Sequence, residues 1–265
     1  PGADADAILT VWRDELLPKV GEIWTRFPER AALENLAHGL LPPATGNDNP
    51  LHYEDAAVSR AVAIGLFHAG RPAKAAELAA AEASISQGED GIWGARAFAH
   101  AIAALEGGAD LDEALSGAEA TFPQGSWIEA EHQKALACRE ASNSLPELAL
   151  LLARNVINNV YSFGNAAPET VPAAFEIVRA ARGDLIGAVN TAVLIAKSAD
   201  SLPPFVGALC GAASGADALG DLWVEQLDTL RGCCLPFLAG VKLSELAAAV
   251  GVSGSGPRGT SAGGT

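Results

Sequence analysis

The run "LIAKSADS", residues 194–201, gathers side chains that can do chemistry, and Leu202-Pro203-Pro204 follows it directly. Carboxylate and hydroxyl oxygens bind hard cations, and a carboxylate can also act as a general base. Candidate catalytic residues in this run are Asp200 as base, Lys197 as acid, and Ser198 and Ser201 as hydrogen-bond donors. A structural alternative is that Asp200 or Ser201 caps a helix that begins at the prolines, and that Lys197 neutralises the end of the preceding helix.

A second group of polar residues ends the stretch "GLLPPATGNDNPLHYED", residues 39–55. Its density of proline, glycine and asparagine predicts the longest irregular segment of the fold, and such loops often line sites. His52 is the best histidine candidate for an acid, and Glu54 and Asp55 are candidate ligand-binding carboxylates. The same two carboxylates could instead serve as favourable charges at the start of a helix beginning at Ala56.

Aromatic and polar residues elsewhere are candidates for the walls of a binding cleft. Trp93, Trp127, Tyr161 and Phe163 are expected near helix ends or in loops, where they could bind an apolar or planar ligand. In "NNVYSFGNAAPE", Tyr161, Asn165 and Glu169 could reach the cleft from the side opposite Asp200. The alternative for the aromatic residues is core filling.

Helices must position all these residues. Alanine and leucine recur every three or four positions in segments such as "EDAAVSRAVAIGLFHAG" and "TVPAAFEIVRAARG", which predicts an all-α protein. Pro72 and Pro172 fit the first turns of helices, and Gly70, Gly107 and Gly183 fit the positions just beyond helix ends. Glycines at 207, 211 and 215 predict a helix face on which another backbone approaches closely.

Composition limits the partners. The 265 residues are 49% hydrophobic, which is sufficient for one domain over residues 1–252, with a disordered Gly/Ser-rich tail over 253–265. The net charge of −15 disfavours nucleic acid, and no apolar run suits a membrane span or a secretion signal. We therefore expect a cytoplasmic protein with a small-molecule partner and no membrane association; its oligomeric state stays open. The four cysteines lack ligand spacing and are expected to be reduced and mostly buried.

The order of segments resembles the ADP-ribosylglycohydrolase family, which includes the lens protein crystallin J1. The resemblance runs from about residue 11 to 230. It is most specific over Glu169 to Ala173, the alanine-rich helix that follows, the acidic run at 196–201 and the Gly/Ala-rich segment ending near Trp223. It implies a single compact helical domain with a central cleft, in which two magnesium ions help to hydrolyse the glycosidic bond of an ADP-ribosyl group.

This sequence departs from the family at the metal motifs. Where the family has Gly-Gly-Asp-Thr-Asp-Thr/Ser, this chain has residues 196–201, "AKSADS", so that serine replaces one aspartate and lysine replaces one glycine. No counterpart of the family's N-terminal Thr-Asp-Asp-Thr motif precedes Trp12, and Glu82 and Ser86-Gln87 replace an aspartate and a Ser-His pair. A hard dication needs about six oxygen ligands, so we expect a degenerate site without a metal cofactor.

Three hypotheses follow. The first is a metal-independent enzyme, of hydrolase or lyase/cyclase type, that acts on a small molecule in a biosynthetic pathway. The second is a non-catalytic relative that binds a ligand or partner. The third is a magnesium-dependent ADP-ribosyl glycohydrolase in which Asp48, Glu54 and Asp55 supply the missing ligands.

Overall fold

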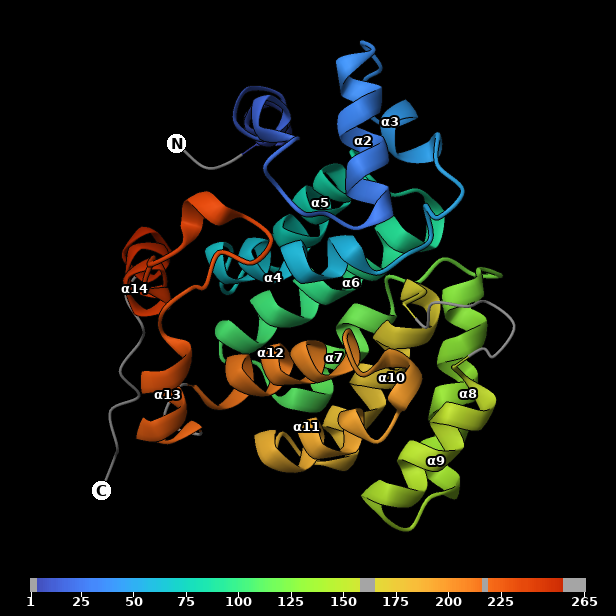
Figure 1. The fold of residues 1–265 in the computed structure, drawn as a ribbon. Helices are drawn as coiled ribbons and strands as arrows, with labels where there is room; N and C mark the ends of the chain where they lie inside the picture. The colour runs from blue at the N-terminus through green and yellow to red at the C-terminus, as the bar shows by residue number, and fades with distance from the viewer. Residues whose placement is uncertain (1–3, 158–164, 216–218, 255–265) are drawn as a thin grey trace.

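The computed structural model describes residues 4–157, 165–215 and 219–254, and all the regular elements in these ranges are helices (Figure 1). The α-helices are α1 (Ala5–Val11), α2 (Phe27–Ala37), α3 (Ala44–Asn47), α4 (Ala56–Phe67), α5 (Pro72–Ala83), α6 (Glu89–Glu106), α7 (Leu111–Glu119), α8 (Trp127–Ala141), α9 (Leu145–Asn155), α10 (Ala167–Ala180), α11 (Leu185–Val193), α12 (Leu202–Ser214), α13 (Asp221–Leu227) and α14 (Leu243–Gly254). Short π and 3-10 segments, η1 (Trp12–Leu16), η2 (Leu17–Lys19), η3 (Ala196–Ser198) and η5 (Pro236–Leu238), join some of them. The predicted all-α class is confirmed.

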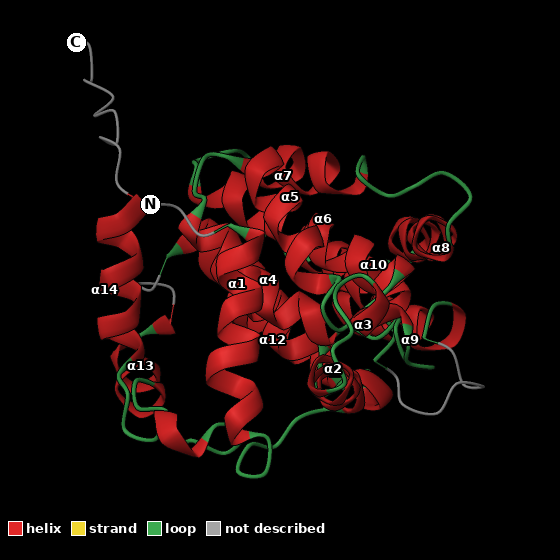
Figure 2. Ribbon diagram, turned by 90° about the horizontal axis from the view of Figure 1, so that it is seen from above, coloured by secondary structure: helices red, strands yellow, loops and turns green. Residues whose placement is uncertain are grey.

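The main core is formed where α4, α6, α10 and α12 meet in the middle of the molecule (Figure 2). Phe98 of α6 lies between Phe175 of α10 and Phe205 of α12, with ring centroids 6.2 and 5.4 Å apart. Alanines fill most of the remaining contact positions, so the helix axes can approach closely around these three rings. The helices α13 and α14 lie at one edge of this core, and α8 and α9 lie at the opposite edge (Figures 1 and 2).

A smaller core joins the N-terminal elements to the rest. Trp12, Ile23, Leu33 and Leu36 are buried together with Ile85, which follows α5. Leu235, from the segment before α14, packs against the same cluster, and the Cys234 carbonyl accepts a hydrogen bond from the Trp24 N–H at 2.8 Å. Segments near both ends of the described chain therefore share one apolar cluster.

Several local predictions can be compared with the structure. Pro72 opens α5, and Gly70 and Gly183 adopt the positive φ expected beyond helix ends. Pro172 was expected in a first turn but lies inside α10, because Pro168 already occupies the first turn of that helix.

The glycine face of α12 was also predicted incorrectly. An added Cβ at Gly207 would be 4.0 Å from Val189, and no described atom lies within 4 Å at Gly211. Gly215 ends the helix with φ of +76°. The small residues therefore do not bring a second backbone into contact here.

The loop at 39–55 contains the single-turn helix α3, and α14 continues through Ser253 to Gly254, the first two residues of the predicted tail; the rest of that tail lies outside the described residues. Cys138 and Cys210 are buried as expected, but Cys233 and Cys234 are exposed because they lie in the surface segment before α14. No helix within the described ranges is long and apolar enough to span a membrane.

Candidate functional site

The 39–55 loop is held against the connection between α5 and α6. The Asn49 amide nitrogen donates to the carbonyl oxygens of Gly46 and Ser86, at 3.0 and 3.1 Å. Only glycine fits at position 46, because a Cβ there would lie 2.2 Å from the Gln87 carbonyl oxygen. The Gly88 N–H also donates to the His52 carbonyl at 3.1 Å. These contacts fix the end of the loop, where the acidic pair Glu54–Asp55 enters α4.

Asp55 is fully buried and is surrounded by donors from three distant elements. Its Oδ1 accepts from Arg26 Nη1 at 2.7 Å, and its Oδ2 accepts from the Thr170 hydroxyl at 2.9 Å. The Ser201 hydroxyl is also hydrogen-bonded to this carboxylate. Burial raises the pKa of Asp55 to about 6, although Arg26, Ser201 and Thr170 each act to lower it.

Glu54 is 3% exposed and faces the same arginine. Its Oε2 lies 3.8 Å from Arg26 Nε, and Asn165 is hydrogen-bonded to its side chain. Burial raises the pKa of Glu54 to about 7; Arg26 opposes this shift, and the neighbouring Asp55 adds to it. A carboxyl group that titrates near neutral pH can both release and accept a proton under physiological conditions.

The 196–201 run contributes to this cluster through its last residue. Ser201 is at the N-cap position of α12, but its side chain makes no capping hydrogen bond and is bonded to Asp55 instead. Ser198 is buried and its carbonyl accepts from the Ser201 N–H at 3.1 Å, which supports the turn. Lys197 is half-buried, whereas Asp200 is exposed. The structure therefore joins Ser201, Glu54, Asp55 and Asn165, and leaves Asp200 on the surface.

The other predicted residues lie around this cluster or away from it. Glu169 is buried in the first turn of α10, beside Thr170. His52 is half-buried; its Nδ1 lies 3.1 Å from the Asn49 carbonyl and its Nε2 lies 3.7 Å from Glu89. Its described contacts are thus with the loop and with α6. Asp48, from the third hypothesis, accepts through its backbone carbonyl from Asn35.

The aromatic candidates divide into three cases. Trp93 is half-buried and packs against the main core, as the core-filling alternative proposed. Trp127 lies at the start of α8, with its ring centroid 5.6 Å from that of Tyr53, the residue before the acidic pair. Tyr161 and Phe163 lie outside the described residues.

The sequence did not indicate Arg26, whose guanidinium is the counter-charge of Glu54 and Asp55. It also did not foresee a second buried cluster around Arg60 of α4. Arg60 donates to Glu29 and Glu82, both at 2.6 Å, and to the Ser86 hydroxyl at 2.6 Å. Glu82 and Ser86 are thus used structurally, and the guanidinium also lies 5.1 Å from the Trp12 ring centroid. Arginine in "WTRFPER" carries no spacing signal, so only the fold reveals its partners.

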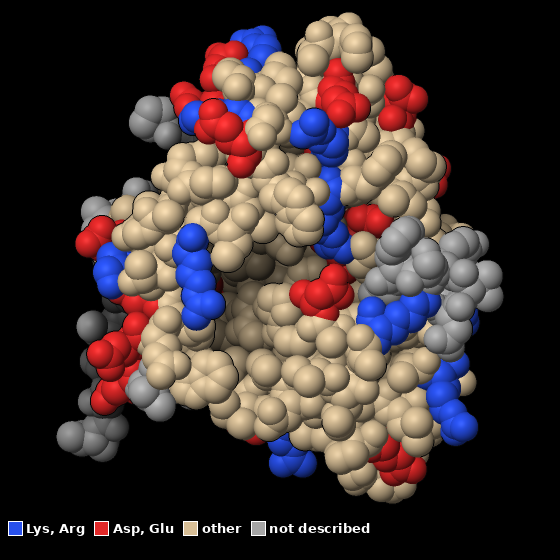
Figure 3. Space-filling model, viewed as in Figure 1, with Lys and Arg blue, Asp and Glu red and all other residues tan. Residues whose placement is uncertain are grey.

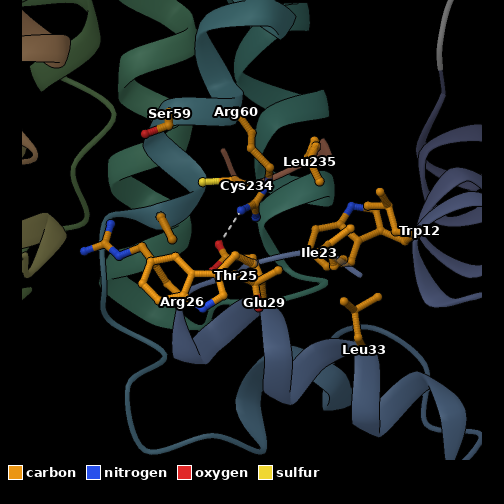
Figure 4. A pocket seen from close by; sticks show the side chains of 13 residues that line it. Trp12, Ile23, Thr25, Arg26, Glu29, Leu33, Ser59, Arg60, Cys234 and Leu235 are labelled. Carbon is orange, nitrogen blue, oxygen red and sulfur yellow. Dashed lines mark hydrogen bonds and ion pairs between the residues drawn. The ribbon is translucent and has the colours of Figure 1, made fainter. Parts of the chain in front are cut away.

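A pocket of about 330 Å³ has both arginines among its lining residues (Figure 4). Trp12, Ile23 and Leu33 form one side, the linked Arg60 and Glu29 lie in the middle, and Arg26 extends away from them (Figure 4). The remaining lining residues are Leu16, Trp24, Thr25, Ala56, Ser59, Cys234 and Leu235. Two of the lining residues are connected to Asp55: Ala56 follows it in the sequence, and Arg26 donates a hydrogen bond to its carboxylate. The acidic pair therefore lies behind one wall of a mainly apolar pocket.

The face seen in Figure 3 is hollowed near its middle, and both basic and acidic side chains stand at the rim of the hollow. Opposite charges at one rim can orient a small polar molecule.

A separate group, Glu119, His132 and Glu176, has ligand-type atoms within 4.8 Å of one another. Arginine partners already hold its carboxylates: Arg179 donates to Glu119 and Glu176 at 2.5 and 2.6 Å, and Arg139 bonds Glu176. This group is therefore a buried ion-pair network that ties α7, α8 and α10 together.

The residues around Glu54 and Asp55 do not fit a dinuclear magnesium centre. Two carboxylates would have to satisfy two dications, yet both face the Arg26 guanidinium. The Thr170 hydroxyl donates to Asp55, and Asp200, the matched aspartate of the other motif, is exposed. Among the described residues the pair is not part of any group of three or more ligand-type side chains whose ligand atoms lie within 4.8 Å of one another, whereas magnesium requires a nearly complete octahedron of oxygen ligands.

Fold and site together define an all-helical protein with a buried acidic pair between the starts of α4, α10 and α12. The sequence matches the ADP-ribosylglycohydrolase family over residues 6–253, so the chain belongs to this family. No match to the chain was found among curated proteins or among solved structures.

Proposed function

We propose that this divergent family member binds a small molecule in the pocket that Arg26 and Arg60 help to line and acts on it without a divalent metal. Glu54 is the proton-transferring group, and the reaction is of hydrolase or lyase/cyclase type. A biosynthetic step in the cytoplasm is part of this proposal. Modified ADP-ribosyl peptides are not the expected substrate, since a pyrophosphate suits a metal-bound cleft better than these apolar walls.

One observation carries the proposal: a buried carboxyl group with a pKa of about 7 lies beside an arginine that lines the pocket. Carboxyl groups with such raised pKa values are concentrated at sites of proton transfer. Arg26 lines the pocket and contacts both carboxylates, so a ligand in the pocket would lie next to the residue that holds the acidic pair.

The non-catalytic alternative also has support. Glu54 and Asp55 do not themselves line the pocket, and Arg26 satisfies their charge. A relative that only binds a ligand would keep the pocket and use the acidic pair as a structural anchor.

The test is a thermal-stability screen of a metabolite library in the presence of EDTA, because a ligand of the native state raises the melting temperature. Ser59→Trp should fill the pocket mouth and abolish the shift, whereas Ser214→Trp, at an exposed position on α12, should leave it unchanged. Turnover of the ligand by the wild type but not by Glu54→Gln would support the enzyme, and binding without turnover would support the alternative. Equal shifts in both tryptophan variants would overturn the pocket assignment.

A further inference from the structure

We infer that the Arg26 guanidinium is a built-in cation that holds the Glu54–Asp55 pair and keeps divalent cations out of it. The inference rests on the proposed metal independence and supplies its physical cause. It also assigns Arg26 a positioning role that sequence motifs do not indicate.

The contacts of Arg26 occupy both carboxylates. Nη1 lies 2.7 Å from Asp55 Oδ1, and Nε lies 3.8 Å from Glu54 Oε2. Different nitrogens of one planar fork thus face different carboxylates. A divalent cation between the two carboxylates would lie where the guanidinium lies, so the guanidinium and the metal compete for one place.

The surroundings also suit a guanidinium. Burial acts to lower the pKa of Arg26, but Asp55 and Glu54 raise it, and Glu29 adds to this effect; the net direction is upward, so the charge is permanent. The Thr170 hydroxyl donates to Asp55 from the other side. With one donor on each oxygen, the carboxylate of Asp55 has partners in two directions before any metal arrives.

The position of Arg26 is fixed by a second ion pair. Arg26 is the residue before α2, and Pro28 occupies the first turn of that helix. Glu29, in the same turn, accepts from the buried Arg60 at 2.6 Å. The Arg60–Glu29 pair therefore anchors the helix start that delivers Arg26 to the acidic pair.

The experiment is a calorimetric titration with Mn²⁺ and Mg²⁺ of the wild type, Arg26→Ala and Arg26→Lys. Arg30→Ala, which removes an exposed arginine from the same helix, is the matched control. We expect the wild type, Arg26→Lys and the control to bind weakly, and Arg26→Ala to bind Mn²⁺ about tenfold or more tightly than they do. Adding Asp55→Asn to Arg26→Ala should abolish the gain.

A second measurement covers the case in which Arg26→Ala is too unstable to titrate. Its melting temperature is followed with Mn²⁺ and with methylguanidinium, which can replace the missing side chain. Each should raise the melting temperature, and the two together should raise it by less than the sum of their separate shifts, because they compete for one place.

Two outcomes would overturn the inference: tight Mn²⁺ binding by the wild type, or neither tighter Mn²⁺ binding nor stabilisation by Mn²⁺ in Arg26→Ala. The ligand screen in EDTA is independent of these results. If Arg26→Ala gains no metal while ligands still stabilise the wild type, the inference fails and the proposed function stands. If Arg26→Ala gains metal binding but no ligand stabilises the wild type, the proposed function fails and the inference stands.

Discussion

Arg26 and Asp55 lie 29 positions apart in the sequence, and their side chains meet with Nη1 and Oδ1 at 2.7 Å. The contact joins the start of α2 to the start of α4, where the 39–55 loop ends. Because Ser201 and Thr170 bond the same carboxylate, Asp55 connects four segments of the fold. It is the residue on which both the stability of the site and its electrostatics depend.

Asp55→Ala should destabilise the protein by about 3 kcal/mol, because it leaves the half-buried Arg26 without its closest counter-charge and removes the acceptor of two hydroxyl groups. Denaturant unfolding monitored by circular dichroism measures this loss. Asp200→Ala, at the exposed aspartate, should change the unfolding free energy by less than about 0.5 kcal/mol. Equal losses in the two variants would contradict the assignment of Asp55 as the centre of the cluster.

The pH dependence of stability should contain a contribution from Glu54. Its pKa is raised from 4.5 to about 7 in the folded protein, so the folded state keeps a proton that the unfolded chain has released. The contribution of Glu54 to the free energy of unfolding is therefore highest below pH 4.5. It decreases as the pH rises to about 7, by an amount on the order of 3 kcal/mol.

Glu54→Gln removes this titration. The difference in unfolding free energy between wild type and Glu54→Gln, measured from pH 4.5 to 8, should change in favour of the variant as the pH rises. A difference that is constant with pH would show that Glu54 titrates at its usual value.

Arg60→Met should also destabilise the protein by about 3 kcal/mol at neutral pH, because Glu29 and Glu82 lose the cation that both contact at 2.6 Å. Denaturant unfolding at neutral pH measures this loss. Arg13→Met replaces an exposed arginine and serves as the control. A loss no greater than that of Arg13→Met would contradict this role of Arg60.

Two of the four thiols should react with an aromatic disulfide reagent in the native protein, and all four should react in denaturant. Cys233 and Cys234 are exposed. Cys138 and Cys210 are buried, and burial raises the pKa of Cys210 to about 11, which further suppresses its thiolate. Mass spectrometry of the labelled peptides identifies the sites; rapid labelling of Cys138 or Cys210 would be incompatible with this core.

The sequence allowed the fold class to be predicted because alanine and leucine spacing reports helical faces directly. Four of the candidate site residues, Glu54, Asp55, Asn165 and Ser201, lie together in the structure. The contact between Asp55 and the 196–201 run, through Ser201, could not be predicted from the family motifs, because it joins segments that are distant in the sequence.

The remaining differences have physical causes. The sequence favoured Asp200 as the base, whereas the proposed function uses Glu54; the two differ because Asp200 is exposed and Glu54 is buried, and burial of one residue in a turn cannot be read from spacing. Arg26 was missed because a lone arginine carries no periodic signal and finds its partners only in the folded chain.

The pocket has walls from opposite ends of the described chain: Trp12 and Trp24 on one side, and Cys234 and Leu235 on the other. Lys19 also lies 4.4 Å from the ring centroid of Phe237, so these segments touch outside the pocket as well. A molecule bound there would contact both segments at once and hold them together without a covalent bond. Its binding should therefore slow hydrogen exchange of the backbone amides of residues 12–26 and of residues 230–241 by similar factors. The two segments, remote in sequence, would then open and close as one unit.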